Sequence, residues 1–170
     1  LLRFFRIPNR TVNSSSDEII APADGKVVVV ETVQENKFLQ KKMWQISIFM
    51  SVWDVHINWY PAKGTVLRSQ HFPGKYLVAR VPKSSERNEQ HITMMALESG
   101  DKILVKQIAG AVARRIINYS EQGFNVKAGK EMGFIRFGSR VDILLPENYT
   151  PAVKPGQVVK GIRDVIAVLK

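Results

Sequence analysis

A glycine followed by a serine, Gly138-Ser139, joins two strand-like segments near the end of the sequence. Residues 133–137 precede the pair, and the apolar run Val141–Leu145 follows it. A serine hydroxyl beside the carbonyl of a flexible glycine can attack that carbonyl and cut the chain. A plain turn between two strands contains the same residue types, so the pair alone leaves both interpretations open.

Histidines are the next residues with suitable proton chemistry. His56 lies among polar and aromatic residues in the segment 51–61, and an unperturbed imidazole pKa of ~6.5 suits proton transfer near neutrality. A buried structural histidine fits that position equally well. His71 precedes a Phe-Pro-Gly-Lys turn and could reach a ligand from there, whereas we interpret His91 as structural or surface-exposed. The histidines are widely spaced and cysteine is absent, so we expect no metal site.

Charged residues supply three further candidates. Asp24 stands between Ala23 and Gly25, where an aspartate most simply bonds its own backbone in a turn. Arg114 and Arg115 are adjacent, and their guanidinium groups suit phosphate or carboxylate. Two neighbouring arginines are also typical of a solvated face.

The elements that must position these residues are mostly short strands separated by Gly and Pro turns. One segment looks helical, because Ile108, Val112 and Ile116 share one face at helical spacing. We therefore predict a β-rich α+β fold, a compact sandwich of short strands with one or two short helices. Three Gly-containing turns resemble those of biotinyl/lipoyl domains. The predicted strands are Val27–Val30, Gln45–Met50, Thr65–Arg68, Tyr76–Val81, His91–Leu97 and Lys102–Ile108.

Composition and net charge limit the number of domains and the classes of binding partner that we expect. The 170 residues are 45% hydrophobic, which predicts one globular domain, 1–170. A net charge of +10 favours polyanions, either nucleic acid or anionic lipid. The start, Leu1–Ile7, mixes bulky apolar residues with arginines, which suits a membrane interface or an arm packed on the core. Because the sequence begins at Leu1 rather than Met, we expect upstream residues, with a membrane anchor among the candidates.

Taken together, the sequence resembles the phosphatidylserine decarboxylases in their short, single-domain form. The resemblance covers nearly the whole chain and depends on the joint order of its motifs, each of which is weak alone. The motifs are Phe4–Arg10, Ala21–Val27, Ile48–Ser51, Val55–Asn58, Pro61–Gly64, Pro73–Lys75, Asn88-Glu89, Gln107–Gly110, Ala113–Ile116 and Gly133–Asp142.

The resemblance implies a proenzyme that cuts itself between Gly138 and Ser139. Residue 139 then becomes a pyruvoyl group, the organic cofactor of the reaction, at the start of an α chain of residues 139–170. The β chain, 1–138, is expected to stay associated with it. His56 is the implied proton-transfer residue, and Asp24 would orient or charge-support a histidine. The product is phosphatidylethanolamine, formed with release of CO2.

Two positions depart from the family pattern. Longer bacterial members have a second histidine three positions after the first, where this sequence has Trp59. Either His56 serves both cleavage and decarboxylation, or another group such as His71 fills one role. Gln90 stands where the family usually has arginine after Asn-Glu.

The expected partners are phosphatidylserine and an anionic membrane, with the protein peripheral on the cytoplasmic face. His71, Arg114 and Arg115 are the candidate substrate-binding residues. The sequence leaves the oligomeric state open, a homo-oligomer included, and a different amino-acid headgroup stays open as substrate. The alternative function is a non-enzymatic lipoyl-like or nucleic-acid-binding β domain. No interleaved basic and aromatic stripe is present, so we expect no nucleic-acid partner.

Overall fold

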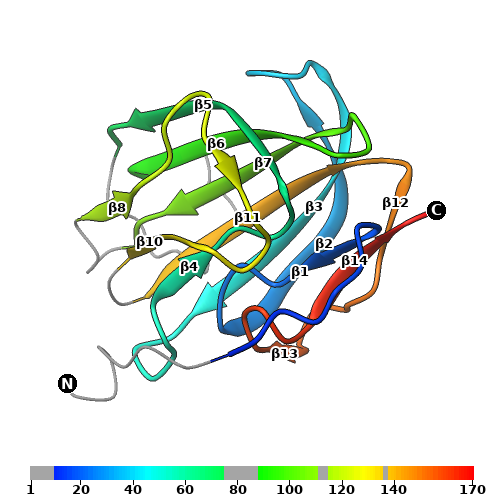
Figure 1. Ribbon diagram of the computed structural model, residues 1–170. Helices are drawn as coiled ribbons and strands as arrows, with labels where there is room; N and C mark the ends of the chain where they lie inside the picture. Colours follow the sequence, from blue (N-terminus) through cyan, green and yellow to red (C-terminus); the bar gives the residue numbers. More distant parts are fainter. Residues whose placement is uncertain (1–9, 75–87, 111–114, 136–137) are drawn as a thin grey trace.

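The computed structural model describes residues 10–74, 88–110, 115–135 and 138–170, and within these ranges all regular structure is β-strand. A large antiparallel sheet of eight strands forms one layer (Figure 1). Its spatial order is β13-β2-β3-β11-β7-β6-β5-β9. The bounds are β13 Val158–Val159, β2 Gly25–Glu35, β3 Lys41–Met50, β11 Ser139–Pro146, β7 Lys102–Ile108, β6 Gln90–Leu97, β5 Gly64–Phe72 and β9 Asn125–Val126.

Two three-stranded antiparallel sheets share the main core with the large sheet. One has the order β4-β10-β8, and the other has the order β1-β14-β12. Residues from both contribute to the largest buried cluster, among them Met132 of β10 and Ile166 of β14. The bounds are β4 Ile57–Trp59, β10 Glu131–Ile135, β8 Ile116–Asn118, β1 Glu18–Ile20, β14 Val165–Leu169 and β12 Tyr149–Pro151.

Strand β11 lies at the centre of the large sheet and is buried along its whole length. Its odd-numbered residues, such as Val141 and Ile143, enter the main core, while Leu144 packs in a second cluster on the opposite face. Successive side chains of a strand point to opposite faces of the sheet. Because both the odd-numbered and the even-numbered residues of β11 are buried, both faces of the sheet are covered at this strand. The apolar run that follows Ser139 therefore anchors this serine at the end of the best-protected strand.

The β-rich part of the sequence prediction is confirmed. Five of the predicted strands lie within β2, β3, β5, β6 and β7. The predicted strand Tyr76–Val81 lies outside the described residues.

The prediction of a helix around Val112 is corrected by the structure. Ile108 is the last residue of β7 and Ile116 the first of β8, while Val112 itself lies outside the described residues. Ile108 pairs with Arg140, and Ile116 pairs with Ile135. Apolar residues spaced by four satisfied the helical pattern, but they belong to two strands in different sheets. No helix is present in the described ranges, and accordingly none there is long and apolar enough to cross a membrane.

Candidate active site

Ser139 begins β11 and is paired across the β11–β3 ladder with Met50. Its side chain is fully buried, and its hydroxyl oxygen has no hydrogen-bond partner among the described residues. An unsatisfied buried polar group costs about 1–3 kcal/mol, so such a group in a native structure needs an explanation. Here the hydroxyl lies next to the Gly138 carbonyl, free of any structural bond that would compete with chemistry.

Gly138 has a φ of +61°, which is the left-handed region that only glycine adopts without strain. A Cβ atom added there would have no neighbouring atom within 4 Å. The requirement for glycine is therefore conformational and not steric. Gly138 thus sets the direction of the peptide bond that joins it to Ser139.

His56 is held between the two chain segments that flank this junction. Its ring is 3% exposed, with Nδ1 2.8 Å from the carbonyl oxygen of Ile135 and Nε2 2.6 Å from that of Ser51. Ile135 ends β10, four residues before Ser139, and Ser51 follows Met50, the pairing partner of Ser139. The histidine therefore fixes the end of β3 relative to the end of β10, beside the Gly138-Ser139 bond.

Burial lowers the pKa of His56, while the carbonyls of Ser51 and Ile135 and the charges of Asp54 and Asp24 raise it. A neutral imidazole has one N–H and can donate to one of the two carbonyls only. The protonated ring satisfies both carbonyls but carries a charge into a buried site. Burial is the largest of these effects, so the pKa of His56 lies below its ordinary value and the neutral ring, which can accept a proton, is favoured near neutrality.

Asp24 lies near this site but is bound to other groups. Its carboxylate accepts hydrogen bonds from both terminal nitrogens of Arg10, one at 2.9 Å, and from the backbone N–H of Gly161 at 2.8 Å. Arg10 also donates to the carbonyl of Gly161 and lies 5.4 Å from the ring centre of Trp59. Asp24 affects His56 through its charge, while the two carbonyls orient the ring. The sequence indicated neither Arg10 nor Gly161 as the partner.

Trp59, which replaces the second histidine of longer family members, fills space instead. It is 5% exposed and packs with Ile20, Val55, Ile57 and Ile162. A Cβ atom on Gly161 would lie 2.2 Å from its ring. The Trp59 ring therefore packs against the Arg10 guanidinium and does not provide a proton-transfer group.

His71 lies three strands away from Ser139 in the large sheet. It pairs with His91, His91 pairs with Gln107, and Gln107 pairs with Val141 of β11. At about 4.8 Å per strand, that separation is about 14 Å along the sheet. The His71 Nε2 atom is 3.4 Å from Glu89, and its side chain is 47% exposed. Arg115 is exposed, and Arg114 lies outside the described residues.

One end of the large sheet gathers several of the sequence motifs. Arg140 pairs with Ile108, so Ser139 and Ala109 are the next residues along their strands. The Ala109 N–H donates to the Glu89 carbonyl at 2.9 Å, and the Asn88 side chain donates to the Ala109 carbonyl at 2.6 Å. The motifs around residues 50, 88 and 109 therefore meet at the Ser139 end of the sheet.

A buried amide network supports this end and was missed by sequence reasoning. The Gln107 Nε2 atom donates to the Asn58 side chain at 2.9 Å, and the Asn118 side chain donates to Gln107 at 2.8 Å. Asn118 also donates to Thr93 at 3.1 Å, and Asn58 to the Met50 sulfur at 3.5 Å. The network fixes β4, which follows His56, onto the large sheet. The one sequence signal for this network was the presence of polar residues within otherwise apolar strands.

No group of three or more His, Asp or Glu side chains in the described part of the chain is arranged to hold a metal ion. Cavities of about 410 and 390 Å3 are present, and neither is lined by Ser139 or His56. At the junction itself, Ser139 is fully buried and Gly138 is half-buried.

Comparison with known proteins gives one consistent result. The family model described as phosphatidylserine decarboxylase matches residues 1–167. A Cytophaga hutchinsonii protein is 47% identical over 167 residues, which are 98% of this chain and 76% of that protein. A Bacteroides thetaiotaomicron protein is 44% identical over 171 residues, covering 100% of this chain and 75% of its own length. Both bear the name phosphatidylserine decarboxylase proenzyme.

Proposed function

The chain belongs to the phosphatidylserine decarboxylase family, and from this membership we infer that it converts phosphatidylserine into phosphatidylethanolamine and CO2. It is a lyase made as a proenzyme. The observation that carries the residue-level proposal is the buried hydroxyl of Ser139, which has no partner in the described part of the chain and lies next to a glycine with positive φ. A non-enzymatic β domain would give no reason for either feature or for the family match.

Maturation begins with attack of the Ser139 hydroxyl oxygen on the Gly138 carbonyl carbon. The amide bond breaks, an ester forms, and the nitrogen of residue 139 becomes a free amine. Elimination then releases the Gly138 carboxylate and leaves a dehydroalanine at residue 139. Addition of water to that residue expels ammonia and leaves a pyruvoyl group. The products are the chains 1–138 and 139–170.

His56 is the group we assign to proton transfer in this sequence. In its neutral form one ring nitrogen can accept a proton, and the carbonyls of Ser51 and Ile135 then stabilise the charged ring. Asp24 adds a negative charge that favours the same protonated state, while it holds Arg10 and Gly161 in place. Asp24 therefore acts as a positioning residue and His56 as the proton carrier.

The surroundings of residue 139 fit a pyruvoyl group. No described hydrogen bond has to be broken when the Ser139 hydroxyl is consumed, and the Ser139 side chain is fully buried. A pyruvoyl carbonyl condenses with the substrate amine and withdraws electrons as CO2 leaves. Main-chain pairing of Arg140 with both Phe49 and Ile108 holds the strand that carries residue 139. The same pairing keeps the two chains associated after the cut.

Substrate binding is proposed to use polar and cationic side chains near the same end of the sheet. His71 is half-exposed beside Glu89, and Arg115 is exposed at the start of β8. Together with Arg114, they suit the phosphate and carboxylate of the headgroup. We also propose a peripheral location on the cytoplasmic face of the membrane, because a net charge of +10 favours an anionic surface.

Intact mass spectrometry of the denatured protein tests the proposal. We expect two chains that meet between Gly138 and Ser139, with a pyruvoyl in place of serine on the smaller one. Ser139→Ala should give one uncut chain. Ser47→Ala is the matched control, because Ser47 is equally buried but its hydroxyl accepts a hydrogen bond from Gln45 at 3.0 Å. A wild-type chain that stays intact with phospholipid present contradicts the proposal.

A further inference from the structure

The turn between β3 and β4 carries an apolar tip that no part of the described structure covers. Trp53 is 73% exposed and Val52 is 45% exposed. Trp53 is the most exposed large hydrophobic side chain in the described ranges. A single exposed apolar residue is ordinary, but an exposed tryptophan beside an exposed valine indicates a surface that meets an apolar phase.

Polar contacts below the tip fix its conformation. The Asp54 carboxylate accepts from the backbone N–H of Ser51 at 2.8 Å and from its hydroxyl at 3.0 Å. The Asp54 N–H donates to the Ser51 carbonyl at 3.1 Å. The Trp53 backbone N–H also donates to the Ser51 hydroxyl at 3.3 Å, so the turn is closed without using the side chains of Val52 or Trp53. The indole is therefore displayed by a stable turn.

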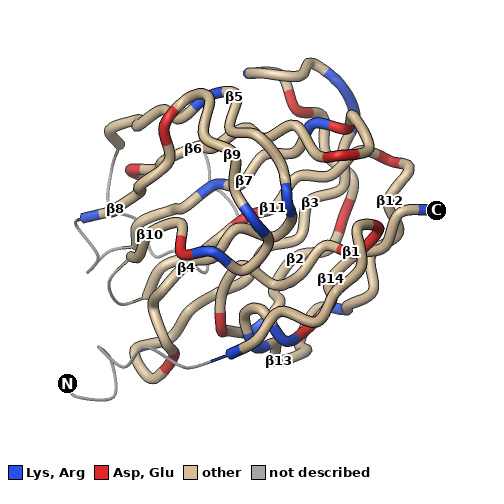
Figure 2. The backbone as a smooth tube through the Cα atoms, in the orientation of Figure 1, with Lys and Arg blue, Asp and Glu red and all other residues tan. Residues whose placement is uncertain are grey.

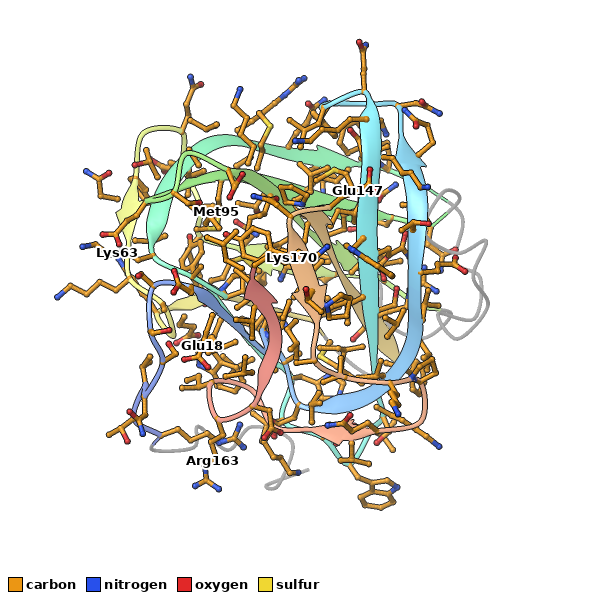
Figure 3. The ribbon with its side chains drawn as sticks, turned by 90° about the vertical axis from the view of Figure 1, so that its right-hand side faces the viewer. Glu18, Lys63, Met95, Glu147, Arg163 and Lys170 are labelled. Carbon is orange, nitrogen blue, oxygen red and sulfur yellow. The ribbon has the colours of Figure 1, made fainter. Side chains whose placement is uncertain are left out.

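The surroundings of this tip are basic. Val158, 63% exposed, pairs with Lys26, and Lys26 pairs with Phe49 near the end of β3. Figure 2 shows Lys and Arg gathered around β13, at the same lower end as the β3–β4 turn, and Figure 3 shows Arg163 projecting from this end. The exposed cations of β2 and of the loops around β13 are Lys26, Lys154, Lys160 and Arg163.

The four cations outnumber the two carboxylates at this end, Asp54 and Asp164. The Asp54 carboxylate is turned toward Ser51. The Asp164 carboxylate accepts the backbone N–H of Lys160 at 2.6 Å. An exposed indole and valine at the same end of the molecule as an excess of cations match the boundary of an anionic bilayer, where tryptophan lies at headgroup level and cations meet phosphate.

We propose that Val52 and Trp53 insert into the headgroup boundary of an anionic membrane, with Lys26, Lys160 and Arg163 against the lipid phosphates. The choice of a lipid partner rests on the proposed function. Ser51, at the base of this turn, provides the carbonyl that contacts His56 Nε2 at 2.6 Å. Docking therefore brings the His56 site to the level of the substrate headgroups.

Vesicle binding tests the surface without turnover. The probe is phosphatidylcholine mixed with phosphatidylglycerol, an anionic lipid without the amine and carboxylate of the substrate. We expect a blue shift of tryptophan fluorescence in the wild type and its loss in Trp53→Phe, in which Trp44 and Trp59 remain. Trp53→Ala should weaken co-sedimentation about tenfold. Phe124→Ala, which removes another exposed aromatic residue, should bind as the wild type does. Equal binding by Trp53→Ala and the wild type overturns the proposal.

Activity on two forms of the substrate separates docking from catalysis. Trp53→Ala should keep its kcat/KM on monomeric short-chain phosphatidylserine and lose about tenfold on vesicles that contain phosphatidylserine. An equal loss on both substrates overturns docking, because it places the effect of the turn on His56. If neither protein decarboxylates either substrate while vesicle binding still depends on Trp53, the docking surface stands and the proposed function fails.

Discussion

Ser139 and Met50 are paired across the β11–β3 ladder, so the residue at the proposed cut is positioned by its main chain and not by its hydroxyl. Met50 in turn accepts a contact from Asn58, two residues after His56. Three segments distant in sequence therefore fix one peptide bond. The predictions below separate the parts of this arrangement that serve chemistry from those that serve stability.

Gly138→Ala should slow self-cleavage and cost about 1–2 kcal/mol of stability, because alanine resists a φ of +61°. Time courses of chain cutting and urea unfolding measure the two effects. Gly100→Ala is the matched control, with a φ of +87° and likewise no atom within 4 Å of an added Cβ. It should show a similar stability cost with normal cleavage. Equal cleavage rates in both variants would remove Gly138 from the mechanism.

His56→Gln should slow cleavage by about 10²-fold or more, because an amide cannot accept and return the proton. In the wild type, burial lowers the pKa of His56 from its ordinary value, so the neutral ring is favoured at pH 7 and the ring gains its proton only in acid. A cleavage rate that depends on the neutral ring should stay level near neutrality and fall in acid. Chain cutting followed by mass against pH measures this. His91→Gln serves as the control and should keep the wild-type profile.

Asp24→Asn should destabilise the protein by about 3 kcal/mol or more, since it leaves the Arg10 guanidinium buried without its charge partner. Arg10→Met should have an effect of similar size. The double variant should be more stable than the sum of the two single losses predicts, as chemical unfolding will show. A normal stability with abolished cleavage in Asp24→Asn would instead indicate direct action on His56.

Titration of His91 should make the free energy of unfolding depend on pH. Burial, and then the charge of His71, lowers the pKa of His91 from 6.5 to about 4. Between these values the unfolded chain holds more protons than the folded one, so stability is complete above about pH 6.5 and falls as pH drops toward 4. Urea midpoints across this range should flatten in His91→Gln. His71→Gln should flatten them less, and an unchanged slope in His91→Gln would contradict the assignment.

The sequence predicted the family and five of the strands because each depends on local residue order. It gave Asp24 the role of orienting or charge-supporting a histidine, and the charge of Asp24 does act to raise the pKa of His56. It did not indicate the hydrogen-bond partners of Asp24, which are Arg10 and Gly161, the latter 137 positions away in sequence. The helix expected around Val112 was wrong at both described ends, because four-residue spacing between two strands imitates a helical face. Hydrogen bonds between residues far apart in sequence, such as that from Gln107 to Asn58, cannot be predicted from the local sequence around either residue.

The central position of β11 has a consequence for the lifetime of the matured protein. After the proposed cut between Gly138 and Ser139, residues 139–170 would still contribute β11 between β3 and β7, and β14 between β1 and β12. The smaller chain cannot leave without dismantling two sheets. Refolding, however, would now require an encounter of two separate chains and would depend on their concentration. Maturation therefore turns a reversible single-chain equilibrium into a one-way event, and the unfolding rate sets how long each molecule survives.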